Sequence, residues 1–135
     1  MATKVLDSWA LIAFFEDEPA AEAVEKLLAQ AAAEKHKLLL SVVNWGEIYY
    51  NTMREVSQEA AEQQARAIAT LPIDIVGVGD DLTLARQAAI FKATHKMSYA
   101  DCFAAALAKT KNAELLTGDP EFKALEKEIK INWLK

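Results

Sequence analysis

The sequence predicts an α/β protein, a three-layer α/β/α sandwich around a mostly parallel central sheet of four to five strands. Short apolar runs of strand length alternate with segments of helical periodicity, an order that favours parallel strands joined by right-handed helical crossovers. The run within residues 37–43 is apolar almost without interruption, as expected of a strand covered on both faces. With 135 residues, the chain has the length of one domain, so we expect a single unit over residues 1–135.

The first quarter of the chain predicts one strand and two helices. The apolar run at 4–6 is of strand type, and Asp7 separates it from a short apolar helix over 9–15. Pro19 then opens an amphipathic helix that runs to Ala31, with acidic residues in its first turn. The order is strand, acid, helix.

The second quarter repeats this order. The strand over 37–43 is followed by Asn44, a plausible N-cap, with Glu47 in the first turn of a helix that runs to Val56. Ser57 caps an alanine-rich helix, which ends at Leu71 because Pro72 cannot continue it.

The third quarter predicts one strand and two helices. Residues 73–78 are a third strand candidate, and Asp80-Asp81 begins a helix that ends at Thr94. Ser98 opens a helix that ends near Lys111 and is free of charge from Cys102 to Ala108, so we expect it to pack at the centre of the sheet.

The last quarter begins with a short strand over 114–117. Gly118-Asp119-Pro120 then forms a turn that caps a helix containing Phe122 and Leu125. Residues 129–134 make a closing strand.

Composition excludes several classes of protein. Although 53% of the residues are hydrophobic, no uncharged run approaches the roughly 20 residues of a membrane helix. The N-terminus lacks the pattern of a signal peptide, so we expect a cytoplasmic protein. Cys102, the single cysteine, is expected to serve packing. The net charge of −5 argues against a protein with a basic body, but residues 82–135 carry +3 and residues 1–81 carry −8.

Four carboxylates lie where strands give way to helices. Asp7, Glu47 and Asp119 follow strands, and parallel strands bring such residues to one edge of the sheet. Asp101 lies one turn into the expected central helix. Each acid, taken alone, is better explained as a helix cap, and Ser98 with Asp101 has the spacing of a capping box.

Together the four acids suggest a different explanation. Up to four negative charges in one cleft repel each other by several kcal/mol unless protons or a cation relieve them. Oxygen-only ligands suit Mg²⁺ or Mn²⁺. The two histidines, His36 and His95, are expected on surface loops, away from such a site.

The motifs around these acids resemble those of PIN-domain ribonucleases, in particular the VapC-type toxins of toxin-antitoxin pairs. They are Val5-Leu6-Asp7-Ser8, Asn44-Trp45-Gly46-Glu47, Ser98-Tyr99-Ala100-Asp101 and Leu116-Thr117-Gly118-Asp119-Pro120-Glu121-Phe122. The resemblance implies that Asp7, Glu47, Asp101 and Asp119 bind Mg²⁺, with Mn²⁺ as a possible substitute, and that Thr117 is their polar neighbour. Trp9 and Cys102 are larger than the residues often found beside these motifs.

The resemblance also implies an activity and partners. The activity would be hydrolysis of RNA by a metal-activated water. The partners would be an RNA substrate, a cognate antitoxin and a second copy of the chain, with the helices over 45–56 and 57–71 as a candidate protein-binding surface. Lys92, Lys96 and Lys123 are candidates to steer the RNA backbone, although each also fits a solvated helix face.

Two other functions remain open at this level. One is a non-catalytic binding module on the same scaffold. The other is a phosphoacceptor domain like that of response regulators, which would need an acid pair after the first strand and a lysine after the last. Here Asp7 is followed by Ser8, and no helix follows the closing strand.

Overall fold

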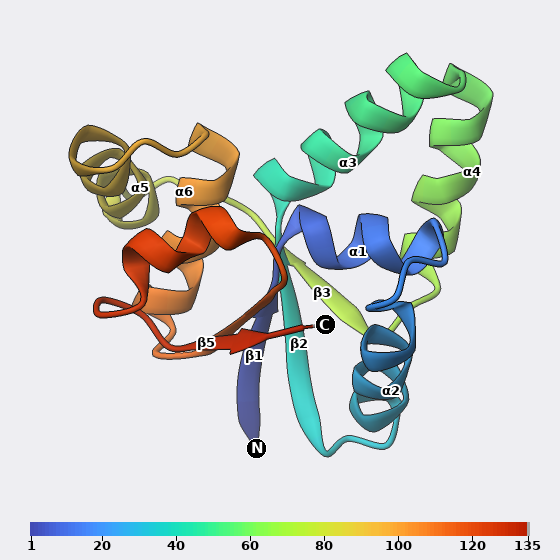
Figure 1. Cartoon of the computed structure of the whole chain (residues 1–135), viewed down its shortest axis with the longest axis horizontal. Helices are drawn as coiled ribbons and strands as arrows, with labels where there is room; N and C mark the ends of the chain where they lie inside the picture. Colours follow the sequence, from blue (N-terminus) through green and yellow to red (C-terminus); the bar gives the residue numbers. More distant parts are fainter. Residues whose placement is uncertain (135) are drawn as a thin grey trace.

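The computed structural model describes residues 1–134 and shows a parallel sheet between two helical layers (Figure 1). The strands are β1 (Ala2–Leu6), β2 (His36–Ser41), β3 (Ile73–Val76), β4 (Glu114–Thr117) and β5 (Ile131–Trp133). The helices are α1 (Ser8–Phe15), α2 (Ala21–Ala32), α3 (Val42–Glu55), α4 (Gln58–Ala69), α5 (Thr83–Thr94), α6 (Tyr99–Thr110) and the 3-10 helix η1 (Pro120–Leu125). The predicted fold class is confirmed.

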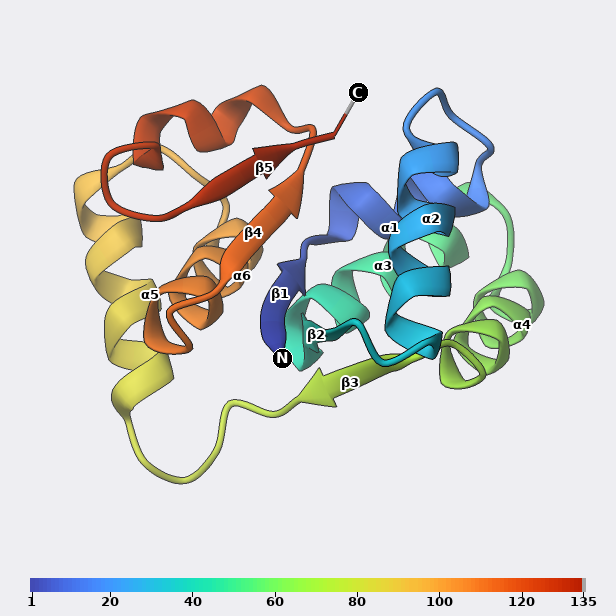
Figure 2. The same cartoon turned by 90° about the horizontal axis from the view of Figure 1, so that it is seen from below.

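The sheet separates two hydrophobic cores because its side chains alternate between faces. Val5, Leu39 and Leu115 lie in the core formed with α5, α6 and η1. Their neighbours Leu6 and Leu40 lie in the core formed with α1 and α2. Figures 1 and 2 show the two helical layers on opposite sides of the strands. The uninterrupted apolar run of β2 is therefore explained by burial on both faces.

The strand order β3-β2-β1-β4-β5 places β1 at the centre of the sheet. From β1 the chain adds β2 and β3 on one side and then β4 and β5 on the other, so the order of strands reverses beside β1. All four strand pairs are parallel, so their carboxyl ends lie at one edge. The crevice beside such a reversal is where open α/β sheets bind ligands. The carboxyl ends of β1 and β4 are therefore the place to look for a functional site.

The boundary between β2 and α3 differs from the prediction. The strand ends at Ser41, which is the N-cap of α3 through an Oγ that accepts a hydrogen bond from the Val43 N–H at 3.2 Å. The assignment of Asn44 as N-cap is therefore wrong. Val42 and Val43 are β-branched and favoured a strand, but in the first turn of a helix no preceding turn crowds such side chains. Asn44 lies inside α3 and is completely buried.

Other element ends differ by two or three residues. The helix α5 begins at Thr83, and the carboxylate of Asp81 accepts a hydrogen bond from the Thr83 N–H at 3.0 Å. The strands β3 and β5 are shorter than the predicted 73–78 and 129–134. Within residues 1–134, no helix combines the length and the apolarity that crossing a bilayer requires.

The prediction of surface loops is wrong for His36, whereas His95 does lie in the loop after α5 and is half-buried. His36 is the first residue of β2 and is buried, with Nε2 at 3.0 Å from the carbonyl oxygen of Leu27. His95 follows α5, and its Nε2 lies 3.1 Å from the carboxylate of Glu128. The Leu27 carbonyl lies nine residues from His36 and Glu128 lies in the segment before β5, and composition and spacing reveal neither contact. Cys102 is completely buried, as predicted.

Candidate metal centre

Asp7 is fixed at the carboxyl end of the central strand. It is the N-cap of α1, and its Oδ1 accepts a hydrogen bond from the Ala10 N–H at 2.9 Å. Its Oδ2 accepts a hydrogen bond from the hydroxyl of Thr117, at the end of the neighbouring strand β4, at 2.5 Å. Only 1% of Asp7 is exposed. The capping explanation therefore holds for one oxygen, while the other oxygen faces β4.

Thr117 links two of the predicted carboxylates. Its Oγ1 accepts a hydrogen bond from the Asp119 N–H at 3.0 Å while it donates to Asp7. A hydroxyl has one proton, so this arrangement commits that proton to Asp7 and a lone pair to the loop that carries Asp119. Thr117 is completely buried. It therefore sets the relative position of two chain segments that come from opposite ends of the sequence.

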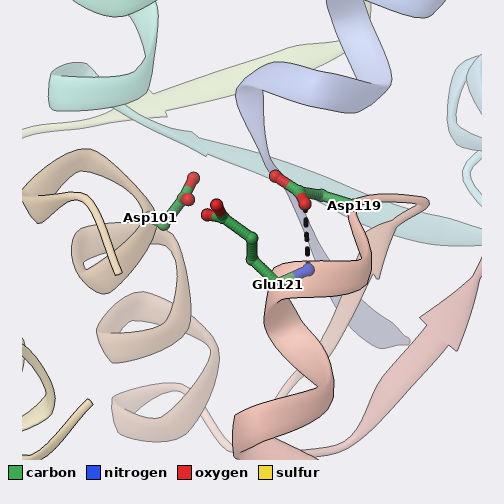
Figure 3. A group of neighbouring side chains, drawn as sticks. All are labelled: Asp101, Asp119 and Glu121. Atoms are coloured by element: carbon green, nitrogen blue, oxygen red, sulfur yellow. Dashed lines mark hydrogen bonds between the residues drawn. The ribbon is translucent and has the colours of Figure 1, made fainter. Parts of the chain in front are cut away.

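Three carboxylates lie close together near Asp7 and Thr117. Oxygens of Asp101, Asp119 and Glu121 lie within 4.8 Å of one another, and we call these residues the carboxylate trio. Figure 3 shows Asp101 on α6 facing Glu121 on η1, with Asp119 beside them. Asp119 caps η1 by accepting a hydrogen bond from the Glu121 N–H at 3.0 Å. Ser98 caps α6 by accepting a hydrogen bond from the Asp101 N–H, which leaves the Asp101 carboxylate directed toward Glu121.

Glu47 approaches the site from α3, although it lies outside the trio. Its Oε1 accepts a short hydrogen bond from the hydroxyl of Ser8. The buried Asn44 supports Ser8, because its Nδ2 donates to the Ser8 oxygen at 3.2 Å and to the Ala100 carbonyl at 3.1 Å. The Oδ1 of Asn44 is buried and lacks a partner among the described residues. Asn44 thus joins α1, α3 and α6 behind the carboxylates.

Burial raises the pKa of Asp7 from its ordinary 3.8 to about 7. The hydrogen bonds from Thr117 and Ala10 lower the pKa in opposition, and the charges of Asp101 and Asp119 raise it further. The two hydrogen bonds therefore do not offset the cost of burying the ionised Asp7 carboxylate.

Burial likewise raises the pKa of Asp101 from 3.8 to about 7. The charges of Glu47, Asp119 and Glu121 act in the same direction, and the hydroxyl of Ser98 opposes them. Glu47 is therefore close enough to Asp101 for its charge to raise the pKa of that residue, although it lies outside the trio. Without a cation, the site is a group of acids that destabilise one another's ionised forms.

The donor set fits a hard divalent cation. Every candidate ligand is a carboxylate oxygen, the type that Mg²⁺ and Mn²⁺ prefer. Among residues 1–134, the ion pairs join Lys4 to Glu114, Lys37 to Asp74 and His95 to Glu128, so no side-chain cation neutralises the site. A bound cation would supply the missing positive charge.

Of the four predicted ligands, Asp101 and Asp119 belong to the trio, whereas Asp7 and Glu47 lie outside it. Two further residues near these acids were not predicted. Glu121 was not predicted as a site residue, although its position in the first turn after Asp119-Pro120 was a usable signal. Asn44 was interpreted as a cap, and nothing in its spacing indicates that it is buried behind Ser8 and Glu47.

Substitution of Thr117 tests its role as the link between Asp7 and Asp119. Thr117→Val keeps the side-chain shape but leaves the half-buried Asp119 N–H and the buried Asp7 carboxylate without their shared partner. We therefore expect a loss of about 1–3 kcal/mol in unfolding free energy. Because such supporting hydrogen bonds orient ligands, we also expect Mg²⁺ affinity to fall by about 10- to 100-fold. Urea denaturation and calorimetric titration measure the two effects. Thr117→Ser retains the hydroxyl and should stay close to the parent in both.

The loop between Thr117 and Asp119 leaves no room for a side chain. A Cβ at Gly118 would lie 2.2 Å from Cη2 of Trp9, so the indole packs directly on this glycine. Gly118→Ala must displace the indole or the loop, and we expect a loss of about 1–3 kcal/mol from overpacking. Gly46, inside α3, has nothing within 4 Å of a built Cβ. Gly46→Ala should therefore stabilise the protein by about 0.5–1 kcal/mol. If thermal melts show the same change in melting temperature for Gly118→Ala and Gly46→Ala, the close packing of Trp9 on Gly118 would be contradicted.

Known proteins share this fold. A family model described as PIN domain matches residues 4–128. Similar solved structures include VapBC2 of Rickettsia felis bound to a promoter DNA fragment, with a TM-score of 0.74 and 14% identity over 98% of this chain and 99% of that chain. Another is VapC20 of Mycobacterium tuberculosis, a toxin that cleaves the Sarcin-Ricin loop. Its TM-score is 0.69 and its sequence identity is 18%, over 90% of this chain and 93% of that chain. At these identities the likeness establishes the fold. No curated protein matches the sequence closely enough to count as a relative.

Proposed function

Because the chain belongs to the PIN domain family, whose model spans residues 4–128, we propose that it is a Mg²⁺-dependent endoribonuclease. The observation that carries this proposal is the convergence of Asp101, Asp119 and Glu121 within 4.8 Å beside the buried Asp7. Mn²⁺ is a possible substitute for Mg²⁺, since both take oxygen ligands.

The trio would hold the cation together with Asp7, and Glu47 would complete the set from α3. When bound, the cation would polarise the scissile phosphate and lower the pKa of a water ligand. The chain's own residues do the positioning: Thr117 orients Oδ2 of Asp7, and Ser8 orients Oε1 of Glu47. A cation also reverses the local sign of charge, which lets an anionic RNA approach a cluster of acids.

The first test is cleavage of labelled single-stranded RNA with excess Mg²⁺ and with EDTA. We expect cleavage in Mg²⁺, loss in EDTA and recovery when Mn²⁺ is supplied. Equal cleavage in EDTA would exclude the metal-dependent mechanism. If Mg²⁺ raises the melting temperature but no RNA is cut, the alternative of a non-catalytic binding module is favoured instead.

We further propose that the protein is the toxin of a toxin-antitoxin pair, a single-domain cytoplasmic protein that forms a homodimer. Support comes from the VapBC structures that share its fold. The helix α3 also exposes Tyr50 and Met53, each to 45%, and its C-cap Val56 is 71% exposed. Exposed apolar side chains of this kind favour protein contacts. Co-expression with the product of the adjacent reading frame should suppress RNA cleavage, and light scattering measures the oligomeric state.

A further inference from the structure

An open hollow of about 620 Å³ lies next to the carboxylate trio. It is lined by residues 92–98, which end α5 and lead into α6, and by Glu121 on η1. Figure 2 shows this connection passing beside η1. The volume falls within the roughly 300–1,000 Å³ of ligand pockets. Because Glu121 belongs to both, the hollow and the trio share a wall.

The hollow has the opposite charge to the trio. Lys92 and Lys96 line it, and Glu121 is the single acid among its lining residues. His95 also lines it, but its Nε2 is engaged by Glu128 and its Nδ1 lies 2.9 Å from the hydroxyl of Thr94. Within residues 1–134, neither lysine belongs to an ion pair. Two lysine ammonium groups are therefore available to an anion.

Lys92 is held in place before any ligand arrives. Its Nζ donates a hydrogen bond to the carbonyl oxygen of Met97 at 2.7 Å. An ammonium group has three protons, so two remain for a ligand. This bond fixes one positive charge on the connection that leads directly to Ser98 and the helix that carries Asp101. Less side-chain entropy is then lost when an anion binds.

We propose that this hollow binds a backbone phosphate of the RNA strand next to the scissile one, with Lys92 and Lys96 as its cations. This inference rests on the proposed ribonuclease function. On the proposed function, the acids would hold the cation that contacts the scissile phosphate, whereas a neighbouring phosphate would have no such cation and would need side-chain charge. Lys92 and Lys96 provide that positive charge in the hollow, which borders the trio at Glu121. Base identity plays no part in this contact.

The test measures RNA binding apart from cleavage. A fluorescein-labelled single-stranded RNA of mixed sequence is titrated into Asp7→Asn protein in Mg²⁺, so that the RNA stays intact, and anisotropy is followed over a range of KCl concentrations. Adding Lys96→Gln to this background should weaken binding about five- to tenfold and reduce the salt slope by about 0.7, the value for one phosphate contact on a single strand. Lys92→Gln should act in the same direction.

Lys35 provides the control, because it is exposed in the turn before β2 at the opposite edge of the sheet. Lys35→Gln makes the same change of net charge and should leave affinity and slope unchanged. Unchanged binding in Lys96→Gln and Lys92→Gln, or an equal loss in Lys35→Gln, would overturn the site. Melting curves confirm that each variant is folded.

The outcomes separate this inference from the proposed function. If the parent cleaves RNA and the lysine variants keep its KM, the function stands and the phosphate site falls. If the parent never cleaves RNA but its RNA binding depends on Lys92 and Lys96, the site stands and the nuclease falls.

Discussion

Asp101→Asn is expected to lower Mg²⁺-dependent RNA cleavage by roughly 10²- to 10³-fold, the range for loss of one electrostatic group in an active site. The substitution keeps the shape of the side chain but removes a negative oxygen from the trio. It should not unfold the protein, because Ser98 caps α6 through its own hydroxyl and the Asp101 carboxylate caps nothing. Initial rates on labelled RNA and metal affinity by calorimetric titration provide the two measurements.

Asp80→Asn is the matched control, since Asp80 is an exposed acid before α5 and outside the trio. It makes the same chemical change and should keep the full rate. Cleavage by Asp101→Asn within twofold of the parent would remove Asp101 from the site. A large loss of stability in that variant would instead restore the helix-capping explanation of this residue.

The metal-free protein is expected to lose stability as pH rises from about 4 to about 7. Burial and neighbouring charges raise the pKa of both Asp7 and Asp101 from 3.8 to about 7 in the folded chain. The folded state therefore binds these protons more tightly than the unfolded state, and the stability they contribute is complete below pH 3.8 and lost as pH passes through 7. For a group as buried as Asp7, a shift of this size corresponds to about 4 kcal/mol.

Urea denaturation in EDTA at a series of pH values measures this loss. Excess Mg²⁺ should restore stability above pH 7, because it binds the ionised folded site and not the unfolded chain. NaCl at equal ionic strength is the control for screening. In Asp101→Asn the fall with pH should be shallower, and at pH 8 without metal this variant should be at least as stable as the parent. A metal-free parent that gains stability between pH 5 and 7 would contradict the assigned shifts.

Much of the site could be predicted because a parallel sheet converts sequence order into spatial position. Asp7 and Asp119 each follow a strand, and the pairing of β1 with β4 brings their segments together without any knowledge of side-chain contacts. The amphipathic and uncharged helices likewise indicated which segments cover the sheet. These inferences depend on patterns of many residues, which tolerate errors at single positions.

The remainder depends on single side-chain directions, which sequence patterns do not fix. Glu121 joins the trio because η1 packs beside α6, and a pattern that places a residue in a helix does not say which neighbour it meets. Asn44 is buried because Ser41, three residues earlier, takes the capping role. Both hydroxyl and amide side chains are good caps, so the choice between them was decided by tertiary contacts.

The hydrogen bond between Thr117 and Asp7 joins positions 110 residues apart. A ribosome releases the N-terminal segments first, and a polypeptide that ends before α6 would lack Asp101, Asp119 and Glu121 altogether. On the proposed function, RNA cleavage therefore requires the chain to be synthesised past Glu121, because a polypeptide that stops earlier cannot form the trio.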